Sequence, residues 1–187
     1  METLSARITH FFLQKHYIEA EQAKWFQYGL TRRMMGCLTF LLLLPIGAIL
    51  VDWIGSFLYL YTFRFLRTRT GGYHAKTPCG CLLTSLCTMF VALTLAKFFH
   101  SPLLVGIVLF AAALCIFALA PANNASLHLT SSEIAAIRPR VQLRLASAVL
   151  IGCLLLYVCV PLASCIAVSL LAVSIMLVVA NSGLGAQ

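Results

Sequence analysis

Long apolar runs, separated by short polar segments, constrain the fold of this chain more than any other feature. They cover residues 34–51, 82–99, 103–119, 141–157 and 162–180. Each has about the length that an α-helix needs to cross a bilayer. Because 61% of the residues are hydrophobic and only 10% are charged, the chain also lies outside the range of soluble domains. We therefore predict an all-α polytopic membrane protein with a single membrane domain over residues 1–187.

A shorter apolar segment, residues 54–65, crosses a membrane only if its helix continues into the arginines that follow. Asp52 and Trp53 precede it and predict a turn at the opposite interface, because Trp favours that depth and Asp avoids the interior. We expect about six transmembrane or re-entrant helices, with four full spans as the alternative. Pro45 and Gly47 predict a kink in the first span.

The amino-terminal region, residues 1–33, alternates apolar and charged side chains at helical spacing. Such a pattern predicts an amphipathic helix that lies in the cytoplasmic membrane interface and ends at Arg32 and Arg33. The alternative is a helix packed on the loops of its own chain. The residues that form its apolar side are Ile8, Phe11, Phe12, Tyr17, Ile18, Trp25, Phe26 and Tyr28.

The distribution of basic residues predicts the orientation. If the six spans alternate in direction, every Lys and Arg except Lys97 falls on one side of the membrane. By the positive-inside rule, that side is cytoplasmic and holds the amino terminus, the segment 64–81 and a second loop at 121–140. The net charge of +8 is therefore spread over membrane-flanking loops, which favours anionic lipids or an acidic peptide as partners over nucleic acid.

The segment 64–81 is a polar island with the composition of a thiol active site. Thr77 and Pro78 predict a helix start, which places Cys79 at the second helical position and Cys81 at the fourth. The helix dipole and the basic residues Arg67, Arg69 and Lys76 stabilise a thiolate there. His74 lies on the loop that enters the helix, where it can act as a general base.

Several points stay open from spacing alone. Cys79 and Cys81 point to different faces of the helix, so only one of them is expected to meet His74. Gly72 lets the backbone bend before the histidine, and Ser85 shares the face of Cys81. A zinc site is disfavoured because a fourth ligand is missing, and the island can also serve only as a lipid anchor. The six cysteines inside the apolar runs are interpreted as small hydrophobic residues.

These residues resemble the accessory gene regulator protein B (AgrB) family of quorum-sensing membrane endopeptidases. The resemblance rests on the arginine-rich segment, on Gly72 two residues before His74, and on Cys81 seven residues after it. Ala120-Pro121-Ala122 at the end of the fourth apolar run is a second match. Length, basic amino terminus and span pattern agree as well, so the likeness covers nearly the whole chain.

The resemblance implies that His74 and Cys81 form a catalytic dyad and that Arg67 and Gly72 support the loop. It implies a bacterial cell-membrane enzyme, a homodimer without metal or cofactor. This enzyme cuts the acidic tail from a small precursor resembling AgrD and promotes closure of a thiolactone or lactone. We further expect Arg64, Arg67, Arg69 and Lys76 to bind that tail. The alternative functions are a non-enzymatic peptide exporter and a membrane scaffold.

Overall fold

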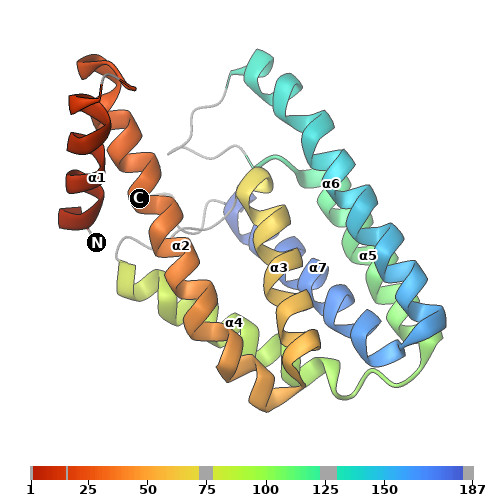
Figure 1. The fold of residues 1–187 in the computed structure, drawn as a ribbon. Helices are drawn as coiled ribbons and strands as arrows, with labels where there is room; N and C mark the ends of the chain where they lie inside the picture. Colours follow the sequence, from red (N-terminus) through yellow and green to blue (C-terminus); the bar gives the residue numbers. More distant parts are fainter. Residues whose placement is uncertain (1, 16, 72–77, 123–129, 183–187) are drawn as a thin grey trace. The chain divides into compact units, whose positions relative to one another are not determined.

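The computed structural model describes residues 2–15, 17–71, 78–122 and 130–182, and this part of the chain is helical without strands (Figure 1). The predicted all-α class is confirmed. The chain divides into two compact units, Met1–Leu43 (unit 1) and Leu44–Gln187 (unit 2). The elements in chain order are α1 (Glu2–Gln14), the 3₁₀ turn η1 (Ala20–Gln22), α2 (Ala23–Leu50), α3 (Trp53–Thr70), α4 (Pro78–Ala96), α5 (Pro102–Leu119), α6 (Ser131–Val158) and α7 (Val160–Asn181).

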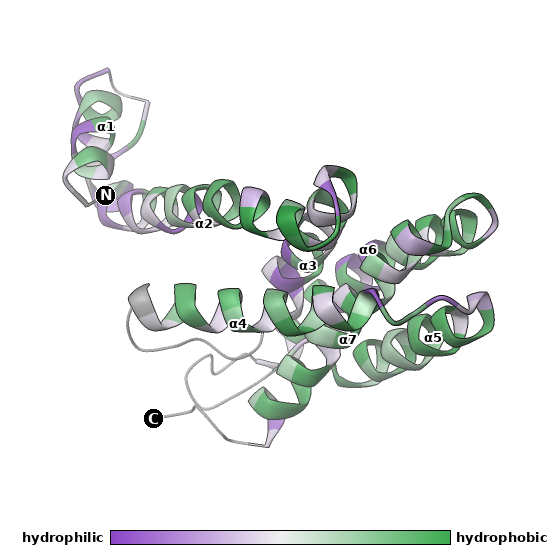
Figure 2. Ribbon diagram, turned by 90° about the horizontal axis from the view of Figure 1, so that it is seen from below, coloured by the Kyte–Doolittle hydropathy of each residue, from purple (hydrophilic) through white to green (hydrophobic). Residues whose placement is uncertain are grey.

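Four helices are long and apolar enough to cross a membrane: α2, α5, most of α6 (Ser132–Val158) and α7. A shorter apolar stretch, Gly80–Ala96, makes up most of α4. Figure 2 shows the apolar character of α5 and of most of α4, whereas hydrophilic residues are prominent in α1, the first half of α2 and α3. The polytopic membrane class is therefore confirmed, and α3 differs from the four candidate spans because it carries three arginines near its end.

In unit 1, α1 folds back on the first turns of α2. The ring centroids of Phe12 and Phe26 lie 5.4 Å apart, and Thr31 Oγ1 donates to Ser5 Oγ at 2.7 Å. Ser5 and Thr9 are buried. The amino-terminal helix α1 therefore packs on its own chain, but on helix α2 and not on loops. Several aromatic side chains of this unit stay exposed. These are Phe11, Tyr17, Trp25 and Tyr28.

The helix boundaries in this region differ from the predicted ones. We expected one helix that ends at Arg32 and Arg33, but α1 ends at Gln14 and α2 runs through both arginines to Leu50. The physical reason is that arginine interrupts an apolar run without interrupting a helix, since it is a good helix former. Pro45 lies inside α2, as a membrane helix tolerates.

Helix α7 forms the centre of unit 2. It packs against α5, α3, α6 and α4 (Figure 1). Most of its side chains are buried. Small residues such as Ala163, Ser164 and Ala167 let the neighbouring backbones approach it closely. A Cβ built on Gly55 of α3 would lie 3.1 Å from Cys165 Sγ, which shows how near α3 and α7 come.

One end of unit 2 is made by the α2–α3 turn and the ends of α4 and α7. Asp52 caps α3 by accepting a hydrogen bond from the Gly55 amide at 2.6 Å, which confirms the predicted turn. Ser56 Oγ donates to the Leu44 carbonyl at 3.0 Å, and Ser164 Oγ donates to the Ala96 carbonyl at 3.4 Å. The opposite end of unit 2 carries the segments predicted to be functional.

Helices extend into both predicted polar segments. Helix α3 continues through the arginines to Thr70, which is the continuation that a crossing by residues 54–65 needs, and α4 begins at Pro78, as predicted. Helix α6 starts at Ser131, inside the predicted 121–140 loop, and includes Pro139. Its start is set by a capping box in which Thr130 and Glu133 satisfy each other's backbone amides.

Candidate active site

The last turn of α3 fixes the point where the chain leaves for the segment that contains His74. Gly71 ends the helix with a φ of 71°, a left-handed conformation that favours glycine. Its carbonyl accepts a hydrogen bond from Arg67 Nη1 and a longer one, 3.4 Å, from Thr70 Oγ1. Arg67 thereby reaches along its own helix and holds the first residue of the connection.

A second contact ties this turn to the segment after α5. The Ala122 amide donates to the Thr70 carbonyl at 2.8 Å. Thr70, Ala120 and Ala122 are all buried, so the bond lies away from water. Asn181 Nδ2 at the end of α7 also donates to the Leu119 carbonyl, at 3.4 Å. The ends of α3, α5 and α7 therefore meet at one end of unit 2, which we call the basic end.

Cys81 lies in the first turn of α4. The helix begins at Pro78, so Cys79 and Cys81 occupy the second and fourth helical positions, as predicted. The Cys81 thiol is free and exposed, which suits a nucleophile that must meet a peptide. Thr84 donates its hydroxyl to the Gly80 carbonyl at 2.8 Å. Ser85 is half-buried one turn after Cys81.

Arg67 interacts electrostatically with Cys81. Burial lowers the pKa of Arg67 from 12.5 to about 10, and the negative charge of a Cys81 thiolate acts in the opposite direction. A pKa of about 10 still leaves the guanidinium charged at neutral pH. The structure thus brings together two residues that the sequence analysis singled out, Arg67 and Cys81, from two different helices.

The other predicted residues fall into two groups. Gly72, His74 and Lys76 lie outside the described residues, as does the side chain of Cys79. Arg64 is half-buried on α3, one turn before Arg67. Arg69 is exposed and points to a different side of α3, because two residues correspond to about 200° around a helix.

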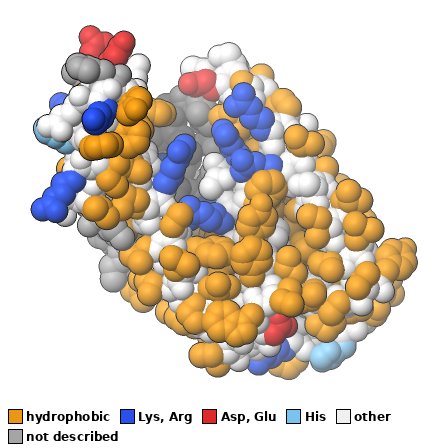
Figure 3. Space-filling model, viewed as in Figure 1, with side chains coloured by type: hydrophobic (Ala, Val, Ile, Leu, Met, Phe, Trp, Pro, Cys, Tyr) orange, Lys and Arg blue, Asp and Glu red, His pale blue; other side chains and the backbone are white. Residues whose placement is uncertain are grey.

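Arg144 on α6 is a residue that the sequence analysis did not place near this site. Its Nη1 donates to the Phe65 carbonyl at 2.6 Å and to Thr68 Oγ1 at 2.7 Å. Its guanidinium lies 4.6 Å from the centroid of the Phe65 ring and interacts electrostatically with Arg69. Figure 3 shows Lys and Arg side chains gathered over the upper ends of α3 and α6. The sequence signal for Arg144 was its place in the group of basic residues on one membrane side.

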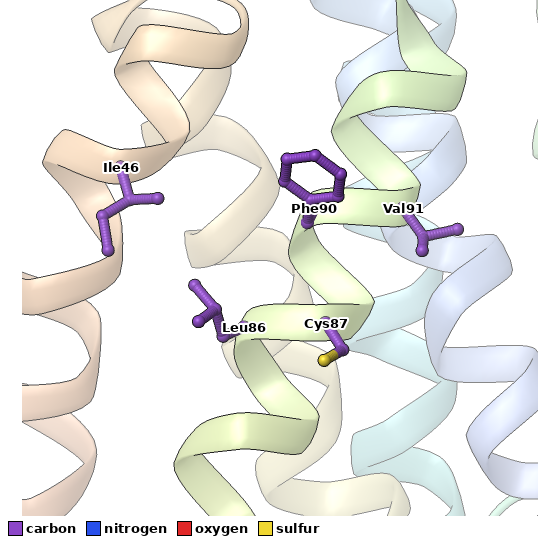
Figure 4. Close-up of a pocket in the computed structure, with 5 residues that line it drawn as sticks. All are labelled: Ile46, Leu86, Cys87, Phe90 and Val91. Carbon is purple, nitrogen blue, oxygen red and sulfur yellow. The ribbon is translucent and has the colours of Figure 1, made fainter.

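An apolar pocket of about 420 Å³ lies farther along α4. Figure 4 shows Ile46 of α2 facing Leu86 and Phe90 of α4 across the space between the two helices, with Cys87 and Val91 completing the lining. Apart from the Cys87 thiol this lining is hydrocarbon and contains no base to activate that thiol, so we do not assign peptide cleavage to it. Among the described residues, no group of His, Cys, Asp and Glu side chains is placed to hold a metal ion.

Comparison with known proteins identifies the family. The model of the family described as Accessory gene regulator B matches residues 5–177. Neither the curated proteins nor the solved structures gave a match. The matched region includes α2 to α6, most of α7 and the whole polar island. It supports a part in accessory gene regulator peptide processing and implies an AgrD-like peptide as substrate. Because the match covers almost the whole chain, the protein belongs to the accessory gene regulator B family.

Proposed function

We propose that this membrane protein is a cysteine endopeptidase that removes the carboxyl-terminal tail of an AgrD-like precursor. The observation that carries the proposal is the pairing of Cys81 with Arg67. Cys81 is exposed in the first turn of α4, and the half-buried Arg67 cation lies within electrostatic range of its sulfur. A helix amino terminus and a nearby cation both stabilise a thiolate, which is the nucleophilic form of cysteine.

His74 is the proposed general acid and base. His74 lies four residues before Pro78, where α4 begins. It lies three residues after Gly71, whose carbonyl accepts a hydrogen bond from Arg67. In the proposed reaction the Cys81 thiolate attacks the scissile carbonyl and the C–N bond breaks. The leaving amine takes a proton from His74, and the precursor remains bound to Cys81 as a thioester.

Ring closure follows by exchange of the acyl group. An internal Cys thiol of the precursor gives its proton to His74 and attacks the thioester carbonyl, which forms a thiolactone and releases Cys81. A Ser hydroxyl in the same place forms a lactone. Exchange between thioesters is nearly balanced in energy, whereas formation of a thioester from an amide is unfavourable. Capture of the released tail and exclusion of water must therefore help the first step.

Of the four basic residues expected to bind the acidic tail, we propose Arg64 and Lys76 as its contacts, because Arg67 binds the Gly71 carbonyl and Arg69 interacts with Arg144. Both residues flank Arg67 in the sequence, on the side of the membrane that we propose to be cytoplasmic. Arginine binds carboxylates bidentately, which fixes orientation as well as charge. Ser85 is a proposed contact of the loop, and the exposed aromatic residues of unit 1 are proposed to dock the precursor at the interface. The homodimer stays a proposal from family likeness.

The test is cleavage of a precursor by the full-length protein in lipid vesicles. We expect the wild type and Cys79→Ala to release the tail, and Cys81→Ala and His74→Ala to release none. Cys79→Ala is the matched control because it makes the same Cys-to-Ala change at a different thiol, two residues before Cys81. Tail release by Cys81→Ala at the wild-type rate would overturn the role of Cys81, whereas absence of tail release by the wild type would favour an exporter or a scaffold.

A further inference from the structure

We propose that the basic end of unit 2 holds one anionic phospholipid between α3 and α6, with its phosphate on Arg69 and Arg144 and one acyl chain along the aromatic stripe of α3. We define the aromatic stripe as Phe57, Tyr61 and Phe65, which follow one another at four-residue spacing and lead to Arg69. This site is separate from Cys81, and it stands whether or not the chain cleaves a peptide.

The charge at this site lacks an internal counterion. Arg69 and Arg144 interact as like charges, and no carboxylate contacts either one within the described residues. Unit 2 contains only two acidic side chains in its sequence, Asp52 and Glu133. Both are engaged as helix caps, Asp52 at the other end of α3 and Glu133 with Thr130. The two arginines therefore have no carboxylate partner among the described residues, and their combined charge favours binding of an external anion.

The arginine pair is built into the fold. Arg144 uses Nη1 for the Phe65 carbonyl and Thr68 Oγ1, which leaves its other N–H groups for a ligand. The Phe65 ring supports the guanidinium from 4.6 Å. Arg69 is exposed one turn farther along α3. The two cations thus come from neighbouring helices and converge on one place, as in headgroup sites between membrane helices.

The aromatic stripe identifies the ligand as a lipid. Its rings stack in sequence, with 5.7 Å between Phe57 and Tyr61 and 5.7 Å between Tyr61 and Phe65. Phe57 is 46% exposed and Tyr61 is 51% exposed. From Phe57 to Arg69 the helix rises about 18 Å, close to the hydrocarbon depth of one leaflet at about 15 Å. A free phosphate or a peptide carboxylate would leave the exposed apolar surface of these rings uncovered, whereas an acyl chain would cover it.

Native mass spectrometry of the full-length protein tests the headgroup contact. The protein is released from micelles that contain equal amounts of phosphatidylglycerol and phosphatidylcholine with the same acyl chains. We expect retained phosphatidylglycerol to exceed phosphatidylcholine, and the ratio to fall roughly ten- to thirty-fold in Arg69→Gln/Arg144→Gln, the loss expected for two interfacial cations. The control Arg138→Gln/Arg140→Gln changes the same charge on exposed positions of α6 and should keep the ratio within about two-fold.

A second pair of variants tests the chain contact. Tyr61→Ala should lower phosphatidylglycerol retention several-fold, whereas Phe117→Ala, which removes an aromatic side chain of similar exposure from α5, should not. If Arg144→Gln fails to fold, Arg69→Gln alone carries the test, since Arg69 is exposed. Equal retention in the arginine variants and their control would overturn the proposal. Displacement of the lipid by millimolar inorganic phosphate or by an acidic peptide would also overturn it. So would arginine variants that keep the bound lipid but change from dimer to monomer in the same spectra.

Discussion

The amide of Ala122 donates a 2.8 Å hydrogen bond to the carbonyl of Thr70, and this bond joins the two polar segments of the chain. Thr70 is the last residue of α3 and directly precedes Gly71, whose carbonyl accepts a hydrogen bond from Arg67. Ala122 belongs to the Ala120-Pro121-Ala122 motif at the end of α5. Both residues are buried, so the bond is shielded from competing water. The motif after α5 therefore positions the start of the proposed catalytic loop.

Ala122→Pro should remove this bond, because proline has no amide hydrogen. The Thr70 carbonyl would then lie buried without its donor, at a cost of about 1–3 kcal/mol. We expect tail release to fall at least ten-fold. Ala122→Gly keeps the amide and should retain most of the activity, measured as precursor cleavage in vesicles. Equal activity in both variants would show that the bond does not position the loop.

Gly71→Ala should also impair cleavage, through the backbone. Gly71 has a φ of 71°, and an alanine held in this left-handed conformation costs about 1–2 kcal/mol of conformational free energy. The chain can avoid this strain only by turning the carbonyl that accepts from Arg67, so we expect cleavage about ten-fold below the wild type. Gly106→Ala is the control, since a Cβ there meets only Leu156 at 3.9 Å. A fully active Gly71→Ala variant would contradict the role of this turn.

Arg67→Lys should make activity depend on pH in a way that the wild type does not. The burial that lowers the pKa of Arg67 to about 10 applies to a lysine in the same place. Burial would therefore hold the pKa of that lysine below its ordinary value, which is already lower than that of arginine. The lysine is charged below its pKa and neutral above it, so the cation beside Cys81 is lost as pH rises.

The measurement is the ratio of cleavage rates, Arg67→Lys over wild type, from pH 6.5 to pH 9. We expect this ratio to fall steadily as pH increases over this range, because the lysine loses its charge and the arginine does not. Taking a ratio cancels the ionisation of Cys81 and His74 to the extent that both proteins share it. A ratio that stays constant over the range would mean that the charge at this position does not act on the thiol.

Gly47→Ala should lower the stability of the protein, although Gly47 is not part of the proposed active site. A Cβ at Gly47 would overlap Ser56 Oγ, which donates to the Leu44 carbonyl, and would lie 3.1 Å from Leu93 Cδ1. Overpacking of this kind costs about 1–3 kcal/mol. Gly29→Ala has nothing within 4 Å and should be neutral or stabilising, because alanine is the better helix former. Thermal unfolding in the same micelle compares the two, and equal melting temperatures would contradict the close α2–α3 contact.

Hydropathy and helix-start chemistry predicted most of the fold. The break at Pro161, the turn at Asp52 and the position of Cys81 in the first turn of α4 all follow from local signals. The errors have a common cause, because a polar or charged residue ends an apolar run without ending a helix. Arg33 lies inside α2 and Arg69 lies inside α3 for this reason. The capping box at Thr130 was the available signal for the start of α6.

The candidate site was predictable only in part. The sequence pointed to Cys81 and Arg67 but grouped Arg67 with Arg69, since spacing along a chain does not show which neighbour each side chain meets. In the structure Arg67 interacts with Gly71 and Cys81, whereas Arg69 interacts with Arg144. Arg144 lies 79 residues from Phe65, whose carbonyl it binds. A contact of that range depends on how α3 and α6 pack, which no local pattern contains.

The most direct test of the proposed chemistry is the intact mass of the full-length protein in lipid after mixing with its precursor. We predict an adduct on wild type and on Cys79→Ala, with a mass increase equal to the mass of the precursor minus that of the released tail peptide. The adduct should be absent from Cys81→Ala and from His74→Ala. Absence of an adduct and of cleavage in the wild type, with a precursor that is processed in the same cells, would contradict the account.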